Sequence, residues 1–591
     1  MDEFLPVSIT DLENRNIEQL DFIIITGDAY IDHHSFAMAL IGRWLETLGY
    51  SVGIIAQPDF KTCESFKKLG KPKYAFLVSP GNMDSMVNLY TVNKRPRKKD
   101  AYTPGGETGK RPKRASIVYT NRIREAYGDV PIIIGGIEPS LRRFAHYDYW
   151  DDKVRRSILF DSDADLLIYG MGEKPLIEIA ECFESGMKIK DMTFINGTCY
   201  IADNLDNVYD YEMLNSYDEV LKSKEKYAQS FKTQYQNLDY RHAKALVQSH
   251  EEKFLVQNAP CEPLTKDDMD TIYSLKFAKT PHPMYKDSIP ALDEVKFSIT
   301  SSRGCIGGCA FCAINFHQGR HISKRSKESI LEEAIEMTKQ EDFKGYIHDV
   351  GGPTANFYDA YCKKVDDNPC LRLCLYPNKC KHLNISHEEY LSVLKDLRSL
   401  PKVKKVFIRS GLRFDYMLYD NKNDFIGELA KHHVSGQLRT APEHINCDVL
   451  ALMNKPGSDL YKSFLDSFEQ ANKKAGLNQY VLPYFISSHP GSMLKSAIEL
   501  AVYMKKEGFI PEQVQDFYPT PGTLSTCMYY TGINPLTGKK VYVPKSEEEK
   551  LMQRALLQFN NPKNKALVKK ALIKAKRHDL IGSGKNCLIR E

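Results

Sequence analysis

The sequence predicts an α/β protein in two parts, a Rossmann-like domain followed by a partial (β/α)6 TIM-type barrel. The chain has 591 residues, which is more than one hydrophobic core accommodates. Short apolar strand patterns alternate with helical patterns near the N-terminus, and the same alternation resumes after residue 290. Several of these strands end in glycine. Such alternation is typical of a parallel sheet covered by helices.

The first domain is expected over residues 1–185. Its strand patterns include DFIIITGDAY (21–30), PIIIGG (131–136) and ADLLIYGMGE (164–173), each with glycine after the apolar run. In open parallel sheets, ligands bind beyond the carboxyl ends of the strands. Residues 186–290 lose this alternation, and we interpret them as a bridging segment.

Residues 291–535 contain six further strand patterns with helical patterns between them. They are VKFSITS (295–301), GYIHDVGG (345–352), KVFIRSG (405–411), GQLRTAPE (436–443), YVLPYFISS (480–488) and QVQDFYPT (513–520). Six such units predict an open barrel with its chemistry at the carboxyl ends of the strands. Residues 536–591 form a basic extension. Within it, Leu567, Val568, Ala571 and Leu572 share one helical face, which predicts a docked surface helix.

Bulk composition excludes some partners. The net charge of +5 is too small to indicate a nucleic-acid partner, although residues 94–114 form a basic stretch expected to be an exposed loop. No apolar run reaches the roughly 18 residues of a membrane span. The acidic N-terminus lacks a signal pattern, so a cytoplasmic location and no membrane partner are expected.

The stretch RGCIGGCAFCAINFHQGR (303–320) places Cys305, Cys309 and Cys312 within eight positions. Three thiolates can hold a [4Fe–4S] cluster and leave one iron open to another ligand. Gly307 and Gly308 permit a tight backbone path around such a cluster. Zinc is the rival, but structural zinc usually takes four ligands from two paired motifs. Three unligated cysteines are the remaining alternative.

The segment CIGGCAFC resembles the CxxxCxxC signature of radical S-adenosylmethionine (radical SAM) enzymes, including Phe311 before the third cysteine. The resemblance implies that S-adenosylmethionine binds the open iron. An electron from a donor such as flavodoxin or ferredoxin then cleaves it, and the resulting 5′-deoxyadenosyl radical acts on a substrate. The protein's part is to orient these groups and to exclude water.

The resemblance continues through the barrel strands and implies further cofactor-binding residues. Gly351 and Gly352 match the element that meets the methionine amino group, although Pro353 replaces its usual acidic residue. The remaining candidates are Arg439 and Glu443 for the ribose and carboxylate, Ser410 and Arg413 at the end of the third strand, and Ile486 on the strand that lines the adenine.

Segments along nearly the whole chain resemble the YgiQ-type radical SAM proteins, among them DAYIDHHSF (28–36), DVGGPTAN (349–356) and MYYTGINP (528–535). This resemblance implies the class of chemistry and leaves the substrate and the catalytic residues unknown.

The first domain also resembles cobalamin-binding domains, which use Asp-x-His-x-x-Gly. Here Asp32 and His34 are followed by Ala37, so the motif lacks its glycine. The glycines of 135–136 and of GMGE (170–173) lie where that family lines the nucleotide tail. We nevertheless expect no cobalamin, and we expect Asp32 and His34 to cap the first helix or to line the domain interface.

A cysteine-rich insertion at 362–382 places Cys362, Cys370, Cys374 and Cys380 close together in sequence. Four cysteines are enough for tetrahedral zinc or for an auxiliary iron–sulfur cluster. Their spacing matches neither common zinc motifs nor ferredoxins. The segment is therefore a candidate second metal site, and a structural insertion with reduced thiols is the alternative.

The leading function is a radical SAM enzyme that acts on an unidentified substrate. One alternative is an RNA-modifying radical SAM transferase, with the basic loop 94–114 and the basic tail contacting phosphates. No recognisable RNA-binding module supports that alternative. A non-enzymatic alternative is a metal-cluster binding or scaffold protein, against which the open iron site argues.

Overall fold

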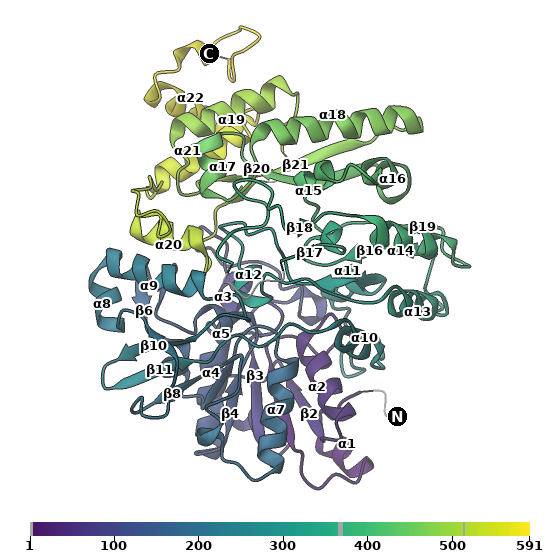
Figure 1. Ribbon diagram of the computed structural model, residues 1–591, viewed down its shortest axis with the longest axis vertical. Helices are drawn as coiled ribbons and strands as arrows, with labels where there is room; N and C mark the ends of the chain where they lie inside the picture. The colour runs from purple at the N-terminus through teal and green to yellow at the C-terminus, as the bar shows by residue number, and fades with distance from the viewer. Residues whose placement is uncertain (1–3, 365–369, 512–513, 591) are drawn as a thin grey trace.

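The computed structural model describes residues 4–364, 370–511 and 514–590. It is an α/β fold whose largest element is a sheet of nine strands in the order β2-β1-β3-β4-β7-β8-β11-β10-β9, seen at the bottom of Figure 1. The first five strands in this order are parallel. They are β1 (Phe22–Thr26), β2 (Val52–Ala56), β3 (Ala75–Ser79), β4 (Ile132–Ile134) and β7 (Leu166–Ile168).

Helices cover both faces of this parallel region. Phe22 and Ile24 of β1 pack with α2 (Ala37–Thr47) and α7 (Glu173–Glu184), whereas Ile23 and Ile25 pack with α4 (Ala115–Tyr127) on the other face. A strand buried on both sides reads as a continuous apolar run, as FIIIT does. The first part is thus a doubly wound sheet with a helix layer on each face.

Residues 186–290, expected to bridge the two parts, contribute four strands to the same sheet. β8 lies antiparallel to β7 and pairs with β11, which in turn pairs with β10. Because β8 and β11 are far apart in the chain, no local hairpin signal announces their pairing. The bounds are β8 (Thr198–Ala202), β9 (Tyr211–Met213), β10 (Ala245–His250) and β11 (Lys253–Gln257).

Most strands of the second part pair in parallel, whereas the short pairs β13–β14 and β17–β18 are antiparallel. β12 pairs with β16, β15 with β19, and β20 with β21, which pairs with β22. The bounds are β12 (Ser298–Thr300), β15 (Tyr346–Ile347), β16 (Asp349–Gly351), β19 (Lys405–Val406), β20 (Gln437–Glu443), β21 (Tyr480–Ser487) and β22 (Gln515–Asp516). The helices α13 (Lys327–Thr338), α14 (Glu388–Ser399) and α18 (Ser458–Ala475) bury one apolar face each in the core beside these strands.

The C-terminal residues form helices α21 (Glu547–Leu557) and α22 (Lys565–Lys574), which share an apolar core with α19 (Leu494–Lys506). Val568, Ala571 and Leu572 are fully buried there, as the helical pattern predicts. These helices lie at the end of the molecule opposite the nine-stranded sheet (Figure 1). Among the described helices, none is long and apolar enough to cross a membrane.

Candidate functional site

The three-cysteine loop, residues 303–320, begins directly after the short strand β13 (Ser302–Arg303). It is fixed by hydrogen bonds from both sides. The amide of Ala310 donates to Met453 O at 2.9 Å, and the amide of Ser525 donates to Ala310 O at 2.9 Å. The side chain of Asn454, which is buried, donates to Gly308 O at 3.1 Å. The backbone that carries the cysteines is therefore held by segments that follow strands β20 and β22.

Gly308 has the left-handed conformation that favours glycine, and both Gly307 and Gly308 lie close to neighbouring side chains. Gly308 has a φ of +63°, and a Cβ there would lie 2.8 Å from Leu373 Cδ2. A Cβ at Gly307 would lie 2.9 Å from Arg413 Nη1 and 3.3 Å from Cys305 Sγ. A side chain at Gly308 would be strained by the backbone conformation, and one at Gly307 would displace the ends of these side chains.

The thiols of Cys305, Cys309 and Cys312 lie within electrostatic reach of one another. Burial raises the pKa of Cys305, and it raises the pKa of Cys312 to about 12. Bound cations reverse this tendency and deprotonate a coordinating thiol. Within 4–364, 370–511 and 514–590, no three His, Cys, Asp or Glu side chains are gathered closely enough for a single metal ion. Three thiolates from one loop can each bind a separate iron of a [4Fe–4S] cluster and leave the fourth iron open.

Arg413, expected to contact S-adenosylmethionine, is used to brace the three-cysteine loop. Its Nη1 donates to Gly307 O at 3.3 Å and lies 3.6 Å from Cys309 Sγ. Its Nε and Nη2 donate to Asp415 at 2.8 and 2.6 Å, and both side chains are buried. The guanidinium thus places a positive charge beside two of the thiols while Asp415 balances it.

Gly351, Gly352 and Ser410 come together at the carboxyl ends of neighbouring strands. The Ser410 hydroxyl donates to Asp349, and a Cβ on Gly351 would lie only 2.5 Å from Ser410 Oγ. A Cβ on Gly352 would lie 2.3 Å from Ser302 O, one residue before Arg303. The two glycines therefore allow the second strand to approach the start of the three-cysteine loop.

Glu443 ends strand β20 in an unusual conformation. It is buried, its φ is +70°, and the strand register shifts just before it. Burial raises its pKa, against the pull of Lys455, whose Nζ lies 3.9 Å away. A non-glycine residue held in this region is strained and is often functional. Arg439 on the same strand is exposed and pairs in register with Leu482.

Phe311 and Ile486 belong to one apolar cluster beside the three-cysteine loop. The ring of Phe311 meets the edge of His489 at a centroid distance of 6.3 Å. His489 is fully buried, and its Nε2 lies 2.6 Å from Ser525 Oγ. This histidine connects the end of β21 to the segment that fixes Ala310.

The burial of His489 predicts an acid-sensitive fold. Burial lowers its pKa to about 3, whereas an unfolded histidine titrates near 6.5. The neutral His489 ring therefore makes its full contribution to the unfolding free energy above pH 6.5. This contribution is lost as the pH falls toward 3. Between pH 7 and pH 5 the unfolding free energy should fall by about 2 kcal/mol from His489 alone.

Urea unfolding at both pH values checks this prediction. In His489→Asn, the fall in unfolding free energy between pH 7 and pH 5 should be smaller by about 2 kcal/mol. His578→Asn, at an exposed position, is the matched control. Equal pH dependence in the wild type and in His489→Asn would contradict the assignment.

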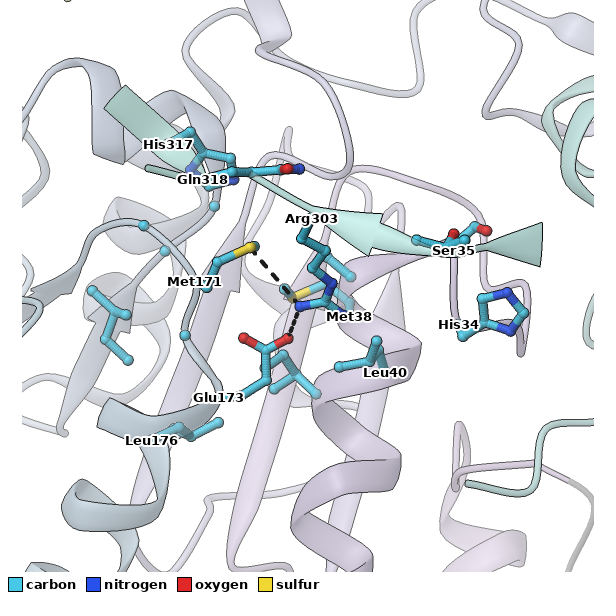
Figure 2. A pocket seen from close by; sticks show the side chains of 18 of the residues that line it. His34, Ser35, Met38, Leu40, Met171, Glu173, Leu176, Arg303, His317 and Gln318 are labelled. Carbon is cyan, nitrogen blue, oxygen red and sulfur yellow. Dashed lines mark hydrogen bonds and ion pairs between the residues drawn. The ribbon is translucent and has the colours of Figure 1, made fainter. Parts of the chain in front are cut away.

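A cavity of about 390 Å³ lies between the first sheet and the second part of the chain (Figure 2). From the first domain it is lined by α2, by α7 and by the glycines that follow β4 and β7. From the second part it is lined by Thr300, Ser302, Arg303, Gly352 and Pro353. The lining is mainly apolar, as is usual for a small-molecule site. The cavity therefore reaches from the parallel sheet to the strand ends beside the three-cysteine loop.

An ion pair lies at the centre of this cavity. Arg303 Nη1 donates to Glu173 Oε1, the first residue of α7, and Arg303 Nε donates to the Tyr273 hydroxyl at 3.1 Å. Figure 2 shows this pair beneath Met171. Glu173 Oε2 is buried and has no hydrogen-bond partner among the described residues. The pair thus joins the two parts of the chain.

Asp32 and His34, which correspond to the cobalamin motif, lie at the interface between the two parts. Asp32 accepts from Arg43 of α2 at 2.8 and 3.0 Å and from the amide of Ala278 at 2.8 Å. His34 Nε2 lies 3.4 Å from Glu333 of helix α13. Both side chains are buried, but Nε2 of His34 has no hydrogen-bond partner among the described residues, and His34 belongs to the lining of the cavity.

Sequence reasoning missed several residues that build this site. Asn454 and Ser525 reach the loop, and Lys455 reaches Glu443, from segments without a recognisable motif. Asp415 was detectable in principle, because it follows Arg413 by two positions and supplies a matching charge. Arg303 directly precedes the signature, but its partner Glu173 is distant in sequence.

Comparison with protein families defines the class. The model described as "Radical SAM N-terminal" matches residues 4–298, and a domain of unknown function (DUF3362) matches residues 512–591. The first match covers the nine-stranded sheet and its helices. The first part of the chain thus matches a domain of the radical SAM class, the class that the cysteine signature resembles.

The chain belongs to the UPF0313 protein family. It is 59% identical over 591 residues to a UPF0313 protein of Clostridium botulinum (strain 657 / Type Ba4), with 99% of this chain and 92% of the relative covered. It is 56% identical over 594 residues to a UPF0313 protein of Clostridium perfringens (strain ATCC 13124), with 100% of this chain and 90% of the relative covered.

Solved structures that are similar to this chain include radical SAM enzymes with cobalamin bound. The methyltransferase TsrM from Kitasatospora setae, with cobalamin and a [4Fe-4S] cluster bound, matches with a TM-score of 0.48 and 12% identity, covering 94% of this chain and 100% of TsrM. The enzyme OxsB with aqua-cobalamin bound matches with a TM-score of 0.48 and 12% identity, covering 96% of this chain and 64% of OxsB. These structures contradict our expectation that cobalamin is absent, which rested on one missing glycine in a short motif.

Proposed function

We propose that this protein is a radical SAM enzyme in which Cys305, Cys309 and Cys312 hold a [4Fe–4S] cluster. The observation that carries the proposal is the glycine cradle, which spreads three thiols around a loop fixed on both sides. When bound, the cluster supplies one electron for reductive cleavage of S-adenosylmethionine at an open iron. The substrate stays unidentified.

The residues around the loop divide the remaining tasks. Arg413 holds the loop and balances thiolate charge, while Asp415 fixes the guanidinium. Gly351 and Gly352 keep the strand ends free of side chains, so a small polar ligand can contact the backbone. Glu443 offers a carboxylate near Cys312, at a strained position that suits a contact with a hydroxyl or amino group.

The cavity receives the second ligand of the reaction. It begins beside Gly352 and Pro353, so a molecule bound there lies next to the strand ends that face the three-cysteine loop. Its walls are mainly apolar, and the paired charges of Arg303 and Glu173 belong to its lining. An apolar-bodied substrate with one donor group fits this lining, as does part of a larger cofactor.

Spectroscopy of the anaerobically purified protein tests the cluster assignment. We expect about four irons for the three-cysteine loop, in accordance with one four-iron cluster. Addition of S-adenosylmethionine should change the electron paramagnetic resonance spectrum of the reduced protein, because a new ligand enters at the open iron. If S-adenosylmethionine left the electron paramagnetic resonance spectrum unchanged, the assignment of an iron open to this ligand would be refuted.

A substitution that fills the cavity tests the second site, with aquocobalamin as the probe. Gly135 has ordinary φ, and a Cβ there would lie no closer than 3.7 Å to Ile168 O. Gly135→Leu should therefore fold and occupy the cavity. If cobalamin binds there, the variant should weaken binding at least tenfold, measured by the visible spectrum of the retained cofactor.

Gly457→Leu is the matched control, because Gly457 is exposed and a Cβ there would meet nothing within 4 Å. Equal cobalamin binding by the two variants would place the cobalamin elsewhere. No binding by the wild type would leave the cavity to the substrate.

A further inference from the structure

The described residues of the four-cysteine insertion, 362–364 and 370–382, pack against the three-cysteine loop. Cys374 and Cys380 contact the same small apolar cluster as Cys305, a cluster built on Phe357 and Tyr416. Leu373, next to Cys374, is the side chain that a Cβ on Gly308 would strike. The insertion is therefore part of the wall around the first site, although it follows a different strand.

The fold brings the four thiols of the insertion together. Cys362 lies in strand β17 (Tyr361–Cys362), which pairs with β18 (Leu383–Asn384) and so returns the chain beside it. The amide of Cys380 donates to Cys374 O at 2.9 Å, which closes a turn between these two cysteines. Cys374 lies within electrostatic reach of Cys380, Cys362 and Cys370, and burial raises its pKa to about 12.

All fourteen cysteines of the chain are free, so no disulfide accounts for this gathering. Four thiolates can hold tetrahedral zinc, or they can hold an iron–sulfur cluster in which each thiolate binds a separate iron.

Two arginines surround the four thiols. Arg320 lies within electrostatic reach of Cys374, and its buried Nε and Nη2 have no hydrogen-bond partner among the described residues. Its guanidinium stacks on Tyr235 at 4.5 Å. Arg241 lies within reach of Cys362. Buried donors without a partner are costly, and a cluster held by four thiolates is an anion that can accept from them.

We propose that Cys362, Cys370, Cys374 and Cys380 hold an auxiliary iron–sulfur cluster beside the three-cysteine loop, with Arg320 donating to its sulfur atoms. This site is chemically complete without the first one, because all four ligands come from the insertion. A four-thiolate cluster has no open iron, so the site stores or passes an electron and does not itself bind S-adenosylmethionine.

Metal analysis of two complementary variants tests the proposal after anaerobic reconstitution with iron and sulfide. The variant Cys305→Ala/Cys309→Ala/Cys312→Ala keeps only the insertion and should retain about four irons. The variant Cys362→Ser/Cys370→Ser/Cys374→Ser/Cys380→Ser should lose the same number relative to the wild type. Cys447→Ser, at an exposed position, is the control and should keep the wild-type count.

The proposal would be overturned if the variant Cys305→Ala/Cys309→Ala/Cys312→Ala held no iron, or held one equivalent of zinc in place of iron. That result would not count against a cluster in the three-cysteine loop, because the four-serine variant keeps that loop and reports on it separately. Should the four-serine variant not fold, the iron count of the first variant still decides. Arg320→Met in the first variant should shift the reduction potential of the remaining cluster, and an unchanged potential would refute the role of Arg320.

Discussion

Cys309→Ala is expected to abolish the first cluster and all cleavage of S-adenosylmethionine. The substitution removes one of three thiolates, and the neighbouring Arg413 would then face a cavity in place of a ligand sulfur at 3.6 Å. Two thiolates do not hold four irons against solvent. Iron should fall by about four per chain, and the reduced variant should form no 5′-deoxyadenosine above background.

Cys447→Ala is the matched control, because this cysteine is exposed at the start of helix α17 (Cys447–Leu452). It should leave the iron content and cleavage unchanged. The assignment fails if Cys309→Ala keeps the full iron content of the wild type.

Arg413→Met is expected to have the second largest effect, on both stability and the cluster. The substitution leaves Asp415 as a buried carboxylate without its cation. Breaking a buried ion pair from one side costs about 3–5 kcal/mol. It also removes the hydrogen bond to Gly307 O and the positive charge beside Cys309. The calorimetric unfolding midpoint should fall by several degrees, and the purified variant should retain less iron.

The double variant Arg413→Met/Asp415→Leu separates the two effects. With both charges removed, most of the lost stability should return, because no buried charge is left unpaired. Iron retention should stay low, since the loop still lacks its brace. A double variant as unstable as the single one would show that Asp415 does not depend on Arg413.

The parts of the fold that depend on local pattern were predictable from the sequence. The run FIIIT is apolar at every position because helices cover both faces of β1, and the strand was visible for that reason. The helix that carries Val568, Ala571 and Leu572 was visible from its periodicity. The tight backbone path at Gly307 and Gly308 was also predictable, because a cluster held by the neighbouring cysteines requires it.

The features that depend on distant partners were not predictable in this way. Strand β8 pairs with β11 across some fifty residues, and one sequence carries no trace of that register. Arg413 matched a family position for S-adenosylmethionine, yet Asp415 and Gly307 occupy its donors. The expectation that cobalamin is absent gave weight to one residue, Ala37, in the motif of Asp32 and His34, and the cobalamin-bound structures of similar proteins contradict it.

The most direct test of the radical SAM assignment is the formation of 5′-deoxyadenosine by the reduced, anaerobically purified protein. The protein is incubated with dithionite and S-adenosylmethionine, and 5′-deoxyadenosine and methionine are quantified together. We predict that both appear in equal amounts and that neither forms in Cys309→Ala. A fully iron-loaded wild-type protein that forms neither product would contradict the account.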